Sequence, residues 1–128
     1  MSLKKEVKFD DFKMIMVIGR GAFGRVYLAE LPGMSKLYAI KAIRKDVLIQ
    51  QEQVKNTTTE MDIMMNLEHP FLVGMDYLFQ NEFRLYFVMP FIRGGELYQI
   101  YLKHKRFAED VIKFIAAQMV LALGYLHK

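Results

Sequence analysis

The stretch that decides the fold reads GRGAFGRV at residues 19–26, and YAIK follows it at residues 38–41. The glycines at positions 19, 21 and 24 carry no Cβ, so the backbone can approach a ligand closely and turn its N–H groups toward anionic oxygens. Lys41 lies within an apolar run, where its ammonium can supply a positive charge to phosphates. The pattern therefore predicts a site for a nucleoside triphosphate.

The same glycine spacing also marks dinucleotide-binding domains, in which the glycine turn opens a helix. Here residues 25–30 read RVYLAE, a short run rich in β-forming residues that Pro32-Gly33 interrupts. A second run of this kind, LYAIKAI, follows at residues 37–43. Asp46 lies where the acid of a dinucleotide-binding domain is expected, but no crossover helix precedes it. Strand, glycine turn and strand therefore predict an antiparallel meander.

The composition is that of a globular protein with one core, since 53% of the 128 residues are hydrophobic and 25% are charged. The absence of cysteine excludes a disulfide scaffold and a thiolate zinc site, and the three histidines lack ligand spacing. The net charge of +4 comes from scattered basic residues, which argues against nucleic-acid binding. No apolar run is long enough for a transmembrane segment or a signal peptide, so we expect a cytoplasmic or nuclear location.

Apolar periodicity and turn residues divide the chain into strands and helices. The strands are expected at residues 12–18, 25–30, 36–43, 75–79 and 84–89. The helices are expected at residues 46–50, 51–66, 96–103 and 108–126, with Asp46 as the cap of the first. In the second helix, Val54, Thr58, Met61 and Met65 share one face at helical spacing. This order predicts an α+β fold with a five-stranded antiparallel sheet, one inserted helix, a linker and two further helices.

The glycine-rich segment and Lys41 resemble the glycine-rich loop and the phosphate-binding lysine of protein kinases, and the resemblance runs from about Phe12 to His127. It implies a kinase small lobe at residues 1–89, a hinge at 90–95 and the start of the large lobe at 96–128. It also implies ATP and Mg²⁺ as cofactors, and transfer of the ATP γ-phosphate to serine or threonine hydroxyls of protein substrates.

The resemblance pairs Lys41 with Glu60, which lies nineteen positions further along the chain, at the kinase spacing. Such a pair aims the lysine at the phosphates, and the position of the helix that carries the glutamate switches this geometry on or off. An unpaired ammonium among apolar neighbours is costly, which also favours an anionic partner. Taken alone, Glu60 fits better as a surface residue of an amphipathic helix; the glycine-rich loop and Lys41 in register favour the pair.

The resemblance further implies an apolar slot for adenine, with Met89 as the gatekeeper at its back. Its upper wall would comprise Ile18, Val26 and Ala39. At the hinge, the carbonyl of Pro90 and the N–H of Ile92 would face adenine. Related kinases commonly carry glutamate where Pro90 stands, but proline lacks only the N–H, so both groups survive. The residues assigned to nucleotide binding are Ile18, Gly19, Gly21, Phe23, Gly24, Val26, Ala39, Lys41, Met89, Pro90, Ile92 and Glu96.

Glu96, in the sequence GGEL at residues 94–97, matches a carboxylate that related kinases place near the ribose and the substrate peptide. There it would favour substrates with an arginine upstream of the phosphorylated residue, through a charge-assisted hydrogen bond. A second interpretation is a first-turn acid that stabilises the dipole of the following helix, and the two are compatible.

Two stretches, IRKDVLI at residues 43–49 and EHPFLV at residues 68–73, resemble the AGC group of serine/threonine kinases. In that group, a pocket of the small lobe receives a hydrophobic motif from the C-terminal tail of the kinase itself. The matching residues here are Lys45, Ile49, Gln80 and Leu85. Ile49 and Leu85 could equally be ordinary core residues of the small lobe.

The resemblance stops at His127, about seven residues before the catalytic aspartate of a kinase is expected. We therefore expect this chain to be part of a longer kinase, with the catalytic loop and the Mg²⁺ ligands in the missing segment, and to be inactive alone. The helix at residues 108–126 is apolar on nearly every face, which is typical of a helix buried all round. The alternatives are a non-catalytic nucleotide-binding or docking module that uses the hydrophobic-motif pocket, and a fragment without function.

Overall fold

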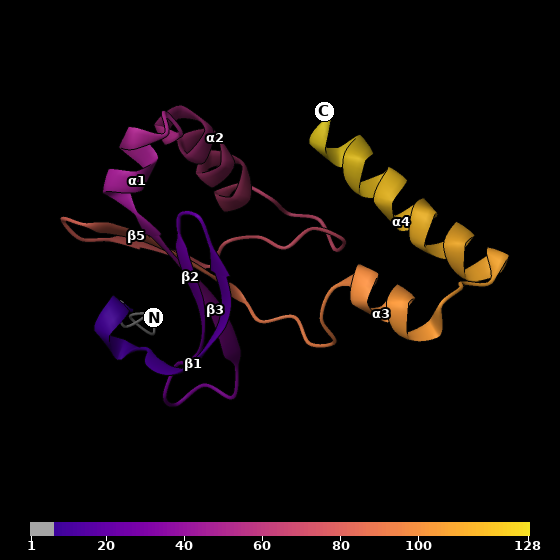
Figure 1. Ribbon diagram of the computed structural model, residues 1–128, viewed down its shortest axis with the longest axis horizontal. Helices are drawn as coiled ribbons and strands as arrows, with labels where there is room; N and C mark the ends of the chain where they lie inside the picture. The colour runs from indigo at the N-terminus through magenta and orange to yellow at the C-terminus, as the bar shows by residue number, and fades with distance from the viewer. Residues whose placement is uncertain (1–6) are drawn as a thin grey trace, which may run out of the picture. The chain divides into compact units, whose positions relative to one another are not determined.

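The computed structural model describes residues 7–128, which form two compact units (Figure 1). The first comprises the described residues up to Asn66 together with Gly74–Phe91, and the second comprises Leu67–Val73 together with Ile92–Lys128. Residues 1–6 of the predicted small lobe lie outside the described part. The assignment of residues 90–95 as a hinge stays a prediction.

A five-stranded antiparallel sheet forms the first unit, with its strands in the order β1-β2-β3-β5-β4. The strands are β1 (Lys13–Gly21), β2 (Gly24–Glu30), β3 (Leu37–Arg44), β4 (Tyr77–Gln80) and β5 (Arg84–Pro90). The predicted α+β fold and antiparallel meander are therefore confirmed. The first two strands are longer than expected, because their pairing continues through Gly21 and Gly24 to a two-residue turn at Ala22-Phe23.

The helical segments of the first unit are a short 3₁₀ turn (Phe9–Asp11), α1 (Lys45–Gln50) and α2 (Val54–Met65). The prediction that Asp46 caps α1 is wrong, because the helix begins one residue earlier and Arg44 is its N-cap. Asp46 instead lies in the first turn, where its carboxylate accepts a hydrogen bond of 2.7 Å from the Arg44 guanidinium. Aspartate does lie at the start of the helix, as its residue type predicts, but the Asp46 carboxylate binds the Arg44 side chain and does not cap the helix.

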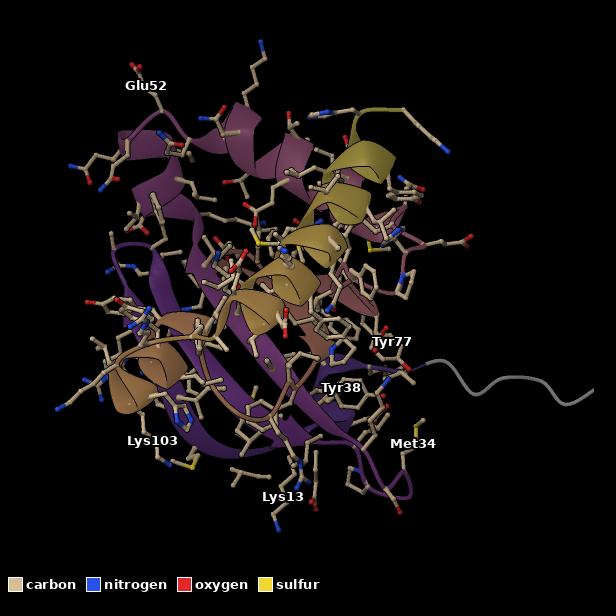
Figure 2. All side chains as sticks on the ribbon, turned by 90° about the vertical axis from the view of Figure 1, so that its right-hand side faces the viewer. Lys13, Met34, Tyr38, Glu52, Tyr77 and Lys103 are labelled. Carbon is tan, nitrogen blue, oxygen red and sulfur yellow. The ribbon has the colours of Figure 1, made fainter. Side chains whose placement is uncertain are left out.

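The turn between α1 and α2 is made by Glu52, which has a positive φ of 55° and lies at the edge of the fold in Figure 2. The N–H of Gln53 donates to the carbonyl of Leu48 at 2.9 Å, and the N–H of Glu52 donates to Ile49 at 3.2 Å. These two bonds form a Schellman ending, with glutamate where glycine is usual. The ending stops α1 and starts α2 in a new direction.

Alternate residues of β3 point into two different apolar cores. On one face Tyr38, Ile40 and Ala42 belong to a buried cluster that also contains Phe12. The Phe12 ring meets the Tyr38 ring edge-on, with centroids 5.4 Å apart. The Tyr77 ring lies 6.2 Å from the Tyr38 ring, and Figure 2 shows these two tyrosines close together. An aromatic core therefore covers this face of the sheet.

The other face of the sheet carries a second core, against which α2 packs. Its buried members are Ile43, Leu48, Met75 and Phe87. Met61 and Met64 supply the packing face of α2. Val54, Thr58 and Met65, which are predicted to share one face with Met61, are exposed, so that face is not the one that packs on the sheet. The helix is rotated so that Met64 faces the sheet, and the N–H of Met75 donates to the Met64 carbonyl at 3.2 Å.

The second unit contains α3 (Leu97–His104) and α4 (Glu109–Leu126), close to the expected ranges. The segment Leu67–Val73 is fastened to α4 through Tyr125, whose hydroxyl accepts a hydrogen bond of 3.0 Å from the N–H of Glu68. Ala122 is the one buried residue of α4. Most of the large apolar side chains of this helix are exposed. Among the residues that the structure describes, no helix is long and apolar enough to cross a membrane.

Replacing Phe87 by alanine is expected to lower the free energy of unfolding by about 3–5 kcal/mol, because the side chain is fully buried (0% exposed) and its removal leaves a cavity in the second core. Urea denaturation followed by circular dichroism measures the loss. The matched control is Phe83→Ala at the turn before β5, where the ring is 69% exposed and the loss should be about 0.5 kcal/mol or less. Equal losses in the two variants would contradict the assigned core.

Candidate functional site

The glycine-rich stretch forms the tip of the β1–β2 hairpin, with Gly21 paired to Gly24. Two contacts fasten this tip to the end of β3. The carbonyl of Phe23 accepts a hydrogen bond of 2.9 Å from the N–H of Arg44, and the Phe23 ring packs against the second core. The hairpin is therefore held in place although its glycines contribute no side chains.

The space available for a Cβ atom differs among the three glycine positions. Gly24 has a φ of +156°, and a Cβ built on it would lie 1.9 Å from the carbonyl oxygen of Ala42, which no relaxation of a side chain can relieve. A Cβ on Gly21 would meet nothing within 4 Å, and one on Gly19 would only touch Val26 at 3.5 Å. The fold therefore requires glycine at 24, whereas the open space at Gly21 is left for a ligand to approach the backbone.

A cavity of about 310 Å³ lies between this hairpin and β3. It is lined by the hairpin residues from Gly19 to Val26 together with Lys41, Ala42 and Ile43. The pairing of the strands explains the arrangement, because Val26 of β2 lies directly opposite Lys41 of β3. The volume is at the lower end of the range for small-molecule sites. The predicted residues Gly19, Gly21, Phe23, Gly24, Val26 and Lys41 thus line one cavity.

Lys41 and Glu60 are not brought together in this structure. Within residues 7–128 the ion pairs are Lys36–Asp76, Arg44–Asp46 and Lys113–Glu109. Glu60 lies on the exposed side of α2, whereas Lys41 is half-buried. No carboxylate of the described residues therefore lies within ion-pair distance of the Lys41 ammonium, and its donors remain for an anionic ligand.

Of the residues assigned to the adenine slot, Val26 lines this cavity, whereas Ile18, Ala39, Met89, Pro90 and Ile92 lie outside its lining. Ala39 is directly opposite Met89 in the β3–β5 pair, and it shares a face with Lys41. Ile18 lies at a register shift in β1, where the strand pairing with β2 is irregular. Pro90 ends β5 one residue later than expected. The following N–H, that of Phe91, donates to the carbonyl of Leu37 at 3.1 Å, so the pairing continues past the proline.

Ile92 and Glu96 belong to the second unit. Ile92 is exposed, and Glu96 is the N-cap residue of α3. The backbone N–H of Glu96 donates to the side-chain oxygen of Gln99 at 3.4 Å. A carboxylate at this position adds favourably to the dipole of α3, which is the second interpretation that the sequence left open.

The four residues matched to a hydrophobic-motif pocket are only partly brought together. Lys45 donates a hydrogen bond of 2.9 Å from its ammonium to the side chain of Gln80, and Gln80 is paired with Leu85 across β4 and β5. Ile49 is 68% exposed and lines a cavity of about 530 Å³ with Lys45 and Phe83, in which Gln80 and Leu85 take no part. Leu85 packs against the second core.

A basic cavity of about 410 Å³ was not predicted from the sequence. Its lining includes Arg20, Arg25, Arg44 and Arg84. In the sequence these basic residues are scattered, because the four come from four different strands. Arg20 and Arg25 do stand symmetrically about the two-residue turn at Ala22-Phe23, and this symmetry was a signal that they share one face.

Within residues 7–128, no three side chains of histidine, cysteine, aspartate or glutamate lie close enough together to hold a metal ion. The cavity beside Lys41 does fit phosphate groups, since open backbone at Gly21 and an ammonium line the same space.

Comparison with known proteins gives a consistent result over nearly the whole chain. Residues 12–128 match the family model described as protein kinase domain. The RAC serine/threonine-protein kinase of Drosophila melanogaster is 44% identical over 124 residues, which cover 96% of this chain and 20% of that protein. Protein kinase 2 of Dictyostelium discoideum is 41% identical over 125 residues, with coverages of 98% and 26%.

A third relative, the serine/threonine-protein kinase Sgk1-A of Xenopus laevis, is 38% identical over 127 residues, which cover 98% of this chain and 29% of that protein. The chain therefore spans between about a fifth and three tenths of the length of these curated relatives.

Replacing Gly24 by alanine is expected to distort the hairpin tip, because the new Cβ would clash with the Ala42 carbonyl and the backbone conformation is strained for any other residue. We expect a loss of about 1–3 kcal/mol in the free energy of unfolding. Chemical denaturation measures this loss. Gly21→Ala is the control, since its Cβ enters open space and should change the stability by about 0.5 kcal/mol at most. A variant at Gly24 as stable as the control would contradict the close approach.

Proposed function

The chain belongs to the protein kinase domain family, and from that premise we propose that it is the ATP-binding part of a serine/threonine protein kinase of the AGC type. The parent protein would transfer the γ-phosphate of ATP to serine or threonine hydroxyls of protein substrates. The observation that carries this proposal is the cavity in which the glycine hairpin and Lys41 share one face. We propose the cytoplasm as its location, with access to the nucleus.

In this proposal the phosphates of ATP occupy the cavity beneath the hairpin, with the α and β phosphates beside Lys41. The backbone at Gly21 approaches them without steric hindrance, and Lys41 supplies a fixed positive charge to the phosphates. Phe23, whose ring packs on the second core, keeps the tip from swinging away from β3. Positioning and charge stabilisation of this kind account for most of the catalysis in phosphoryl transfer.

Glu60 is proposed to position Lys41 rather than to contact the nucleotide. The carboxylate is exposed on α2 and unpaired with Lys41 in this structure, and we propose that a shift of α2 forms the pair. Few buried contacts hold α2: Met61 and Met64 pack on the second core, and neither is fully buried. Adjustable side chains such as methionine suit a helix that shifts on its support. Formation of the pair would be the activating step.

A second candidate function is a docking module that acts through the pocket near Lys45 without catalysis. The bond from Lys45 to Gln80 and the cavity beside the exposed Ile49 favour it. The occupant would be a hydrophobic-motif segment of the C-terminal tail of the parent protein. Both functions can belong to one AGC-type kinase, but only the kinase requires Lys41.

Replacing Lys41 by methionine in the full-length protein is expected to lower phosphoryl transfer at least about a hundredfold, because methionine keeps the shape of the side chain and removes the charge at the phosphates. The rate is measured with radiolabelled ATP at saturating concentration. Lys36→Met is the control: that lysine makes an exposed ion pair with Asp76, and its loss should leave the rate nearly unchanged. Wild-type turnover in the Lys41 variant would exclude the kinase and leave the docking module.

Glu96→Gln is expected to weaken the preference for peptides with an arginine upstream of the acceptor residue, by about 1–3 kcal/mol on those peptides alone. The measurement compares kcat/KM on peptide pairs with and without the arginine. Glu109→Gln provides a matched control, since Glu109 lies in the first turn of α4 as Glu96 lies at the start of α3. If Glu96→Gln lowers kcat/KM equally on both peptides of a pair, Glu96 has no role in substrate choice.

A further inference from the structure

Four of the ten methionines in the sequence gather in the second core, where α2 meets the sheet. Met61 and Met64 come from α2, Met75 lies two residues before β4, and Met89 belongs to β5. Among the described residues, the aromatic core on the opposite face of the sheet contains no methionine. The sequence has no cysteine, so all its sulfur is thioether sulfur. Easily oxidised side chains are therefore concentrated on one face of the sheet.

Two of these methionines provide the apolar contacts of α2 with the sheet. The residues of this helix that are not exposed are Thr57, Met61 and Met64, and none of them is fully buried. Their spacing of four and then three residues places them on one face of the helix. Met61 and Met64 are the two that pack against the second core. The apolar attachment of α2 therefore depends on two thioether side chains.

The sequence of α2 gives this helix little stability of its own. Val54 and the three threonines at residues 57–59 are poor helix formers. The hydroxyls of Thr58 and Thr59 donate to backbone carbonyls four positions earlier, at 2.8 and 3.0 Å, which weakens a helix slightly. The N-cap residue Gln53 makes no capping bond with its side chain. A helix of twelve residues with this composition depends on its packing face.

We propose that Met61 and Met64 are sites of reversible oxidation by peroxides, and that their oxidation releases α2 from the sheet. In this step a lone pair of the Sδ atom attacks one oxygen of hydrogen peroxide, so that an S–O bond forms and the O–O bond breaks. The second oxygen takes up the proton of the first and leaves as water. Sulfur loses two electrons, the peroxide gains them, and methionine becomes methionine sulfoxide. Both side chains are half-buried, so a small oxidant reaches them in the folded chain.

Oxidation makes the second core a poor environment for these two side chains. A sulfoxide is polar, and its oxygen accepts hydrogen bonds. The members of the second core have apolar side chains without a hydrogen-bond donor, so a sulfoxide buried there would be unsatisfied. The oxidised side chains are therefore more stable in water. Turning them outward detaches α2 and breaks the hydrogen bond of 3.2 Å from the N–H of Met75 to the carbonyl of Met64.

The release of α2 would also displace Glu60, which immediately precedes Met61. Under the proposed kinase function, this displacement would prevent the pair with Lys41, and oxidation would lower the rate of phosphoryl transfer. That consequence rests on the proposed function, whereas the release of α2 does not. Methionine sulfoxide reductases would reverse both effects, because they return the sulfoxide to the thioether.

The test measures amide hydrogen exchange of the full chain before and after treatment with hydrogen peroxide. Peptide mapping by mass spectrometry identifies which methionines are oxidised. Once Met61 and Met64 are oxidised, exchange protection of the α2 amides should fall at least about tenfold, while that of the β3 amides should change less than about twofold. Treatment with methionine sulfoxide reductases A and B should restore the protection.

Two double variants separate these methionines from the others. Met61→Leu/Met64→Leu keeps apolar side chains of similar volume that peroxide does not oxidise, so its α2 protection should change less than about twofold on treatment. The matched control is Met34→Leu/Met65→Leu, which removes two methionines that are 50% and 47% exposed. This control should lose α2 protection in peroxide as the wild type does.

The proposal is overturned if the wild type keeps its α2 protection with both methionines oxidised, or if peroxide leaves Met61 and Met64 unmodified in the folded chain. It is also overturned if Met61→Leu/Met64→Leu loses as much protection as the wild type, since Met75 or Met89 would then be responsible. If the double variant does not fold, Met64→Leu alone replaces it, and sensitivity equal to that of the wild type would again overturn the proposal.

A kinase assay of the oxidised full-length protein separates this proposal from the proposed function. Loss of α2 protection together with a lower rate would support both. Loss of α2 protection at an unchanged rate would contradict the role proposed for Glu60 and would still support oxidation of Met61 and Met64 as the event that releases the helix.

Discussion

The pairing of β3 between β2 and β5 is the constraint on which the rest of this structure depends. Because side chains alternate along a strand, this one segment buries Tyr38 and Ile40 in the aromatic core and directs Lys41 to the other face. A slip of one residue would turn Lys41 into the aromatic core and Ile40 away from it. The cost of burying an ammonium there, added to the cost of exposing Ile40, fixes the register that sets Lys41 opposite Val26.

The glycine hairpin takes its position from the same strand. The N–H of Arg44, the last residue of β3, donates to the carbonyl of Phe23, and the carbonyl of Ala42 lies so close to Gly24 that no side chain fits between them. The hairpin tip is therefore a fixed wall of the cavity beside Lys41 although it consists largely of backbone. A phosphate-binding surface needs this combination, since flexible glycines alone would leave the N–H groups without a defined direction.

Much of this arrangement follows from the sequence, and the misses have physical causes. The meander and the position of Lys41 were predictable, because short β-forming runs and turn residues act locally. The packing face of α2 was not predictable from the sequence. Met61 belongs to two overlapping rows of apolar residues along the helix, and only contact with the second core selects the row that includes Met64. The basic cavity depends on pairing between β3 and β5, which brings together Arg44 and Arg84, forty positions apart in the chain. Separation along the chain hides such a cluster.

Charged side chains contribute little to the stability of the first unit. No polar or charged residue of the described chain is buried, and the ion pairs Lys36–Asp76 and Arg44–Asp46 are both exposed to solvent, where such pairs contribute little. Stability therefore comes from the two apolar cores. Within residues 7–128, Arg44 has Asp46 as its counter-charge, whereas no carboxylate lies within ion-pair distance of the Lys41 ammonium. An anionic ligand in the cavity beside Lys41 would supply that missing charge, so the hairpin, held at the end of β3 by the bond from Arg44 to Phe23, is where the fold and the proposed ligand site meet.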